Sequence, residues 1–155
     1  MKIKLLAVGG RMPDWVSQGF EAFASRMPRE LRIELVEIPL AVRGKNSDIE
    51  RAKNTEGEKL LERSTGDLRV MLDERGKGWT SAQLAAKVEG WKQSGRDVSI
   101  LVGGPDGHSD AVKASAEQAW SLSNLTLPHA LVRVLVAEQL YRAWSLSANH
   151  PYHRA

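Results

Sequence analysis

The 155-residue sequence predicts an α/β fold with a mainly parallel sheet and helices on both faces. Short apolar runs typical of strands alternate along the whole chain with longer segments whose apolar residues recur at helical spacing. No repeat, low-complexity tract or linker interrupts this alternation. The sequence therefore predicts a single domain over residues 1–155.

Four strands are predicted. Residues 2–8 are an apolar run that ends at two glycines, and residues 31–38 alternate apolar with charged side chains as a half-buried strand does. Residues 68–73, LRVMLD, and residues 97–102, DVSILV, are the other two. The last strand runs directly into the glycine-rich turn LVGGPDG, residues 101–107. An ordinary tight turn and a ligand-binding loop both explain these glycines.

Helices are predicted between the strands. The first follows Asp14, which we expect to cap it, and ends before Pro28. The second, over residues 47–64, has many charges and few apolar residues, so most of its surface should face solvent. The third, over residues 81–93, begins after Thr80, whose hydroxyl forms a capping box with the glutamine three residues later.

The C-terminal third contains a short helix, expected over residues 109–118, and a long helix that starts at Pro128 and ends near Leu146. On a helical wheel the long helix is apolar on two opposite sides, so we expect both sides to be buried. Its own sheet covers one side, and either a second subunit or a flanking loop covers the other; we favour a homodimer. Arg133 lies within the main apolar stripe, where it should meet a carboxylate, a phosphate or a subunit boundary.

The composition disfavours several classes of function. Cysteine is absent, which excludes disulfides and thiolate chemistry, and the four histidines make a poor set of metal ligands, so no metal site is expected. The N-terminal apolar run is too short for a signal peptide or a membrane span, so we expect a cytoplasmic protein with no membrane partner. A net charge of +3 permits a polyanionic partner without requiring one.

The candidate ligand site lies beyond the carboxyl ends of the predicted strands, where open α/β sheets bind ligands. Leu72 and Asp73 follow the third strand, the glycine turn follows the fourth, and residues 122–127 are expected at the same crevice. Their backbone groups and small or apolar side chains suit a flat heteroaromatic ring. The glycine signatures of phosphate loops are absent, which disfavours dinucleotide oxidoreductases and nucleoside triphosphatases.

The tail NHPYHR, residues 149–154, combines two imidazoles, a phenol and a guanidinium. This mix suits single-stranded RNA, because aromatic rings stack on bases and arginine binds phosphate; a frayed terminus is the alternative. No Ser-His-Asp set or carboxylate pair stands out, so we expect catalysis by positioning of two bound reactants. Basic residues in glycine-containing loops either bind phosphates at the rim of the crevice or are solvated surface charges: Arg11, Arg43, Lys45, Arg75 and Lys77.

Segments that are similar to one known protein family extend from one end of the chain to the other. The main ones are LVGGPDG at 101–107, WSLSNLTLPHALVRVLVAEQLYRAWS at 120–145 and NHPYHR at 149–154. Shorter ones are RMPDW at 11–15, RGKN at 43–46 and GRDVSILVGG at 95–104. Together they closely resemble the ribosomal RNA large subunit methyltransferase H family of the SPOUT superfamily.

This resemblance implies a deep trefoil knot in the C-terminal half and a homodimer. It also implies that S-adenosylmethionine binds in the knot loops. Its methyl group would go to N3 of a pseudouridine in 23S ribosomal RNA, in a large-subunit stem-loop at the subunit interface of assembled ribosomes. The cofactor positions that match are Leu72, Gly103, Leu122, Ser123, Asn124, Leu125, Thr126 and Leu127.

The substrate side is hypothesised to consist of Arg142, Tyr152, His153 and Arg154. His153 or the surroundings of the cofactor would accept the N3 proton, and the arginines would hold a phosphate or a uracil carbonyl. Asp106 and His108 depart from the family pattern beside the site. Two alternatives are a non-enzymatic ribosome-binding factor with a nucleotide-like pocket and a SPOUT methyltransferase that acts on transfer RNA.

Overall fold

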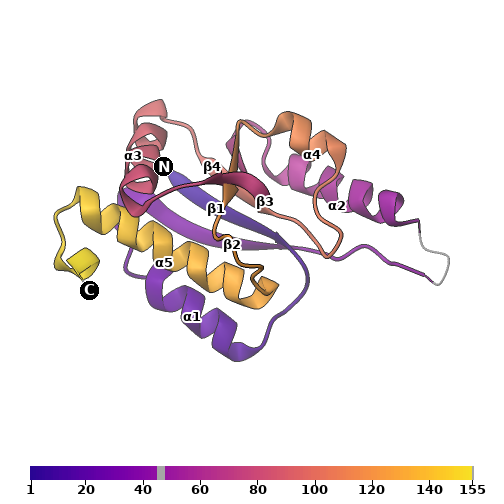
Figure 1. The fold of residues 1–155 in the computed structure, drawn as a ribbon, viewed down its shortest axis with the longest axis horizontal. Coiled ribbons are helices and arrows are strands. Elements are labelled where there is room, and N and C mark those ends of the chain that lie inside the picture. The colour runs from indigo at the N-terminus through magenta and orange to yellow at the C-terminus, as the bar shows by residue number, and fades with distance from the viewer. Residues whose placement is uncertain (45–47, 155) are drawn as a thin grey trace.

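Five parallel strands form one sheet in the order β2-β1-β4-β3-β5 (Figure 1). A computed structural model describes residues 1–44 and 48–154, so Lys45 of the predicted phosphate-binding set and Ser47 of the second predicted helix lie outside the described residues. The strands are β1 (Lys2–Val8), β2 (Arg32–Ile38), β3 (Leu68–Gly78), β4 (Val98–Val102) and β5 (Gln118–Ser121).

Helices cover both faces of this sheet, as the sequence predicts. On one face α5 packs against α1 and α3, and on the other face α2 packs against α4. Figure 1 shows α1 and α5 side by side below the strands and α2 beside α4 on the opposite side. The helices are α1 (Asp14–Ala24), α2 (Ile49–Arg63), α3 (Ser81–Ser94), α4 (Asp110–Ser115) and α5 (His129–Ser147), with short 3-10 helices at Arg29–Leu31 and Pro151–Arg154.

The two central strands separate two apolar cores because successive strand residues point to opposite faces. On β1, Ile3 and Leu5 face the core under α1, α3 and α5, whereas Leu6 and Val8 face the smaller core under α2 and α4. Every residue of β4 is buried, as expected for a strand with neighbours on both edges and helices on both faces. No helix in the described part of the chain is long and apolar enough to cross a membrane.

One of the predicted local features differs from the structure, and two agree with it. The cap of α1 is Pro13 rather than Asp14; Asp14 is the first helical residue and lies 3.6 Å from Arg11. Most of α2 is exposed, as predicted, and its one buried face approaches α4 so closely that a Cβ on Gly57 would overlap the Ser109 hydroxyl. The capping box at Thr80 forms as predicted.

The largest difference concerns β3 and β5. The segment after Asp73, which looks like a loop, continues β3 and pairs with β5 after a shift of register between Leu72 and Lys77. A Cβ on Gly76 would lie 2.7 Å from the backbone of Ala119, so only glycine allows this close pairing. The helix expected through residue 118 ends at Ser115, which leaves four residues to form β5.

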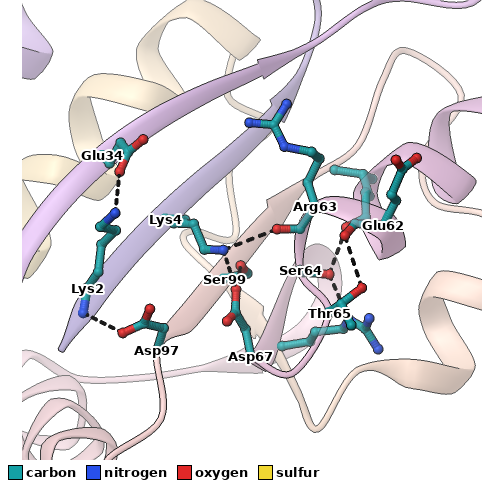
Figure 2. Close-up of polar contacts among 12 residues, drawn as sticks. Lys2, Lys4, Glu34, Glu62, Arg63, Ser64, Thr65, Asp67, Asp97 and Ser99 are labelled. Carbon is teal, nitrogen blue, oxygen red and sulfur yellow. Dashed lines mark hydrogen bonds and ion pairs between the residues drawn. The ribbon is translucent and has the colours of Figure 1, made fainter.

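A polar network closes the amino end of the sheet (Figure 2). The Lys4 ammonium lies 2.7 Å from the Asp67 carboxylate and donates to the Arg63 carbonyl at 3.1 Å. The fully buried Ser99 hydroxyl donates to the same Asp67 carboxylate at 2.7 Å. These four residues, the amino-end network, tie β1 and β4 to the turn between α2 and β3.

Candidate functional site

A cavity of about 990 Å³ lies at the carboxyl end of the sheet, where the sequence predicts a ligand site. Its walls come from the ends of β1, β4 and β5, from the middle of β3 and from the first turn of α5. The lining includes Val8 to Gly10, Leu72 to Arg75, Val102 to His108, Trp120 to Ser123, Leu125 to Leu127, His129 and Val132.

The predicted cofactor residues gather around this cavity, with one exception. Asn124 is exposed and is not among the lining residues, and the cofactor role of the whole set stays a prediction. The segment around it is held by a short turn in which the Leu125 amide donates to the Ser123 hydroxyl at 2.9 Å. The lining members are Leu72, Gly103, Leu122, Ser123, Leu125, Thr126 and Leu127.

The glycine turn is both a tight turn and a wall of the cavity. The Gly107 amide donates to the Gly104 carbonyl at 3.0 Å, and Gly107 has a φ of +85°, which favours glycine. A Cβ on Gly103 would lie 3.1 Å from the Gly107 carbonyl carbon and 3.2 Å from the His108 ring. The chain's own packing therefore already favours glycine at position 103.

His108 belongs to the site although the sequence gives it only as a departure from the family pattern. Its ring is 5% exposed, and its Nε2 lies 3.0 Å from the Leu72 carbonyl oxygen, which joins the turn to β3. Burial lowers the pKa of the imidazole, so the neutral ring donates its Nε2 proton to that carbonyl. The sequence signal that could have indicated a place for His108 in the site is its position directly after the glycine turn.

Buried nitrogens without a hydrogen-bond partner also mark this end of the sheet. Within the described residues, they are Nδ1 of His108, Nε2 of His129 and Nε of Arg133. Arg133 is 1% exposed and meets a carboxylate as expected, since its Nη1 lies 3.1 Å from Glu37. Burial and the neighbouring Arg133 charge lower the pKa of His129, which lines the cavity.

The predicted substrate residues lie together at the other end of α5. The Tyr152 hydroxyl donates to Glu138 at 2.9 Å, and the Arg142 guanidinium donates to the same carboxylate oxygen at 2.6 Å. Burial and this bond to Glu138 raise the pKa of Tyr152. His153 lies 3.5 Å from the Ser145 hydroxyl, so the tail is folded back on α5; the side chain of Arg154 lies outside the described part.

The predicted cofactor residues and the predicted substrate residues of one chain lie apart. His129 and Arg142 lie on the same helix at a distance of about 20 Å, at 1.5 Å per residue. Figure 1 shows the yellow end of α5 near the C-terminus and its orange end near the middle of the view. The structure brings the predicted cofactor residues together around the cavity, and the predicted tail residues together away from it.

A comparison with protein families decides the family. The sequence model described as a predicted SPOUT methyltransferase matches residues 1–153. The chain belongs to the SPOUT methyltransferase family.

Two of the solved structures to which the chain is similar, with TM-scores above 0.5, have the same fold at low sequence identity. A probable methylase family protein from Haemophilus influenzae Rd KW20 is 14% identical, with a TM-score of 0.60 over 97% of this chain and 67% of that one. A tRNA (m1G37) methyltransferase from Aquifex aeolicus is 12% identical, with a TM-score of 0.51 over 90% and 69%. The SpoU methyltransferase AviRb from Streptomyces viridochromogenes, solved with the cofactor AdoMet, is 12% identical with a TM-score of 0.43 over 95% and 61%.

The basic loop residues of this SPOUT methyltransferase are not all free for phosphate. Arg75 lines the cavity and is exposed, as the phosphate-binding hypothesis requires. Arg43 instead is bonded to Glu56 at 2.7 Å and to Asp106 at 2.8 Å. Within the described ranges, no group of three or more His, Asp and Glu side chains could hold a metal ion.

Proposed function

We propose that this SPOUT methyltransferase transfers a methyl group from S-adenosylmethionine to N3 of a pseudouridine in 23S ribosomal RNA, on assembled ribosomes in the cytoplasm. The observation that carries the proposal is the cavity at the carboxyl end of the sheet, in a chain of a methyltransferase family. The substrate follows from the matching segments, above all SLSNLTLPH and NHPYHR. The same resemblance leads us to expect a trefoil knot in the C-terminal half.

The cavity fits the proposed cofactor in size and chemistry. A volume of about 990 Å³ accommodates a nucleoside with an amino acid side arm, and the leucines at 72, 122 and 127 suit an adenine ring. Backbone amides and carbonyls from the glycine turn and from residues 122–127 supply the polar contacts of such a ring. S-adenosylmethionine would supply a methyl group on a positively charged sulfonium sulfur, and the neutral thioether that remains is a good leaving group.

The chain then has to align the acceptor and remove its proton. The N3 nitrogen forms a bond to the methyl carbon while the carbon–sulfur bond breaks, and the N3 proton leaves to a base. His153 is the side chain that we assign to this proton, and Arg142 and Arg154 hold a phosphate or a uracil carbonyl. Removal of the tail after Asn149 should abolish methyl transfer but leave binding of S-adenosylmethionine mostly intact.

The distance between the tail and the cavity supports a homodimer in which the two come from different chains. Within one chain, about 15 Å of helix separates Arg142 from Val132, the lining residue of α5 that is nearest to it in sequence. Leu131 on α5 is 41% exposed and Leu125 beside the cavity is 75% exposed, so both remain available for a second copy. A partner's tail would then complete the substrate side of the site.

Mixing two inactive variants tests the shared site. One variant carries Gly103→Val, which blocks the cavity, and the other ends after Asn149. We expect the mixture to recover part of the wild-type transfer of labelled methyl to ribosomes, because mixed dimers contain one intact cavity and one tail. A mixture as inactive as its components, despite exchange of subunits, would contradict the shared site.

The choice of RNA tests the substrate separately. Purified ribosomes, isolated 23S RNA and transfer RNA are offered with labelled S-adenosylmethionine. We expect label on ribosomes alone, at N3 of a pseudouridine. Label on transfer RNA would support the alternative enzyme, and no uptake of S-adenosylmethionine in calorimetry would support the non-enzymatic binding factor.

A further inference from the structure

An ionic cluster around one buried carboxylate lies behind the glycine turn. Arg43 donates through Nη1 and Nη2 to the two oxygens of Glu56, at 2.7 and 3.1 Å, and through Nε to Asp106 at 2.8 Å. Glu56 in the middle of α2 is 2% exposed. We call these three residues the Arg43 clasp. The hydrogen bonds of Arg43 to Glu56, Asp106 and the Ala41 carbonyl use four of the five N–H donors of the guanidinium, which leaves Arg43 little capacity for an RNA phosphate.

The Arg43 clasp also holds the segment before α2. The Ala41 amide donates to Glu56 at 3.0 Å, and the Arg43 guanidinium donates back to the Ala41 carbonyl at 3.0 Å. Leu40, the residue before this pair, lines the cavity. The clasp thus folds residues 40–43 against α2 and fixes one side of the cavity.

The glycine turn rests directly on the Arg43 clasp. A Cβ on Gly104 would lie 2.8 Å from the Glu56 carboxylate, so the turn touches the carboxylate with no side chain between them. Asp106, two residues later, is bonded to Arg43 and lines the cavity. Arg43 itself is not among the lining residues. Any effect of Arg43 on a ligand therefore passes through the turn and through residues 40–41.

A stabilising role alone is a weak explanation for the Arg43 clasp. Burying Glu56 and its partner costs solvation energy that the ion pair roughly offsets, so such pairs add little net stability over apolar side chains. They do fix geometry, because a guanidinium fork accepts only one arrangement of two carboxylates. Here the geometry that is fixed belongs to two walls of the cavity.

We propose that Arg43 is a positioning residue for cofactor binding, which holds the glycine turn and residues 40–41 in the arrangement that the methyl donor needs. This inference rests on the proposed function, since it takes S-adenosylmethionine as the ligand of the cavity. Loss of the clasp raises the dissociation constant of the methyl donor and leaves turnover at saturating donor nearly unchanged, because Arg43 touches neither reactant.

Arg43→Lys tests the inference, because lysine keeps the charge but cannot bridge both carboxylates. By calorimetry with S-adenosylmethionine, we expect its dissociation constant to rise about tenfold, with kcat at saturating donor within about twofold of the wild type. Arg96→Lys is the matched control. Arg96 makes an Arg–carboxylate bridge of 2.8 Å with Glu117 away from the cavity, and its replacement should change neither quantity.

A second variant keeps the test informative if Arg43→Lys folds poorly. Asp106→Asn removes only the outer half of the Arg43 clasp, and it should raise the dissociation constant by about threefold and speed amide hydrogen exchange in residues 104–107. In the double variant the two increases of the dissociation constant should not add, since both substitutions break the contact between Arg43 and Asp106.

Other outcomes overturn the inference. A lower unfolding midpoint with an unchanged dissociation constant makes the clasp structural only. Unchanged donor binding with weaker, more salt-sensitive ribosome binding makes Arg43 a phosphate contact. Failure of the wild type to bind S-adenosylmethionine refutes the proposed function, and the hydrogen exchange of the turn then still reports whether Arg43 positions it.

Discussion

The two ends of the sheet differ in how fully their buried polar groups are hydrogen-bonded. At the amino end, the Lys4, Asp67 and Ser99 side chains satisfy one another and the Arg63 carbonyl (Figure 2). At the carboxyl end, the described residues include three buried side-chain nitrogens with no partner, on His108, His129 and Arg133. The amino end is complete without a ligand, whereas the carboxyl end leaves hydrogen-bonding capacity beside a cavity. Stability and binding are thus assigned to different ends of the same strands.

Asp67→Ala is the change at the amino end with the largest expected effect. It leaves the Lys4 ammonium and the buried Ser99 hydroxyl without their shared acceptor, so the free energy of unfolding should fall by about 3 kcal/mol. Chemical denaturation measures this loss. Calorimetry on the folded fraction should find binding of S-adenosylmethionine unchanged. Weaker binding would contradict the claim that the amino end contributes to stability alone.

A neighbouring ion pair provides the control for Asp67→Ala. Lys2 and Glu34 lie 3.0 Å apart, but their side chains are 41% and 50% exposed. Glu34→Ala should lower the free energy of unfolding by about 0.5 kcal/mol or less, because solvent replaces the lost contact. A loss as large as that of Asp67→Ala would mean that burial is not the cause.

Gly103→Ala should have the opposite signature. Its Cβ would press against Gly107 and His108 and so distort the turn. The dissociation constant for S-adenosylmethionine should rise about tenfold, while the free energy of unfolding falls by only about 1 kcal/mol. Gly90→Ala is the control, since a Cβ there meets nothing within 4 Å and α3 should gain slightly in stability. Unchanged binding of S-adenosylmethionine in Gly103→Ala would show that the glycine turn is not part of the ligand site.

The smallest expected effect is a pH dependence that originates at the carboxyl end. Burial lowers the folded-state pKa of His108 and His129 below the unfolded value of about 6.5. The unfolded chain therefore binds more protons as the pH falls from about 7 through 6, and stability falls with it. Urea denaturation between pH 8 and 5.5 measures this slope, which His108→Leu should make shallower. A slope that stays the same in His108→Leu would exclude His108 as a source.

Much of this arrangement could be predicted from the sequence because it depends on periodicity and local signals. Alternating strands and helices gave the two-faced sheet, and the Thr80 capping box gave the start of α3. β5 was missed because QAWS is too short to show a period, and the end of β3 was missed because ERGKG has the composition of a loop. Those two segments are held by pairing with each other.

The site was predictable in location but only partly in detail. The rule for open α/β sheets placed the cavity beyond Leu72 and the glycine turn, and the structure has it there. The partners of Arg43 could not be predicted, since Glu56 and Asp106 are distant in sequence and only the fold brings them together. The distance between the tail and the cavity depends likewise on the direction of α5.

The strand order has a consequence for how the chain folds. β1 pairs with β4, and the Lys2 amide bonds to Asp97 at 2.9 Å, so the centre of the sheet joins residues 95 positions apart. During synthesis, the first strand emerges long before its inner neighbour, and α5, which completes the larger core, emerges last. The search for such distant contacts is slow, so we expect folding in milliseconds to seconds rather than microseconds. The nascent chain then carries β1 with one edge paired to β2 and the other edge unpaired until residues 98–102 have been made.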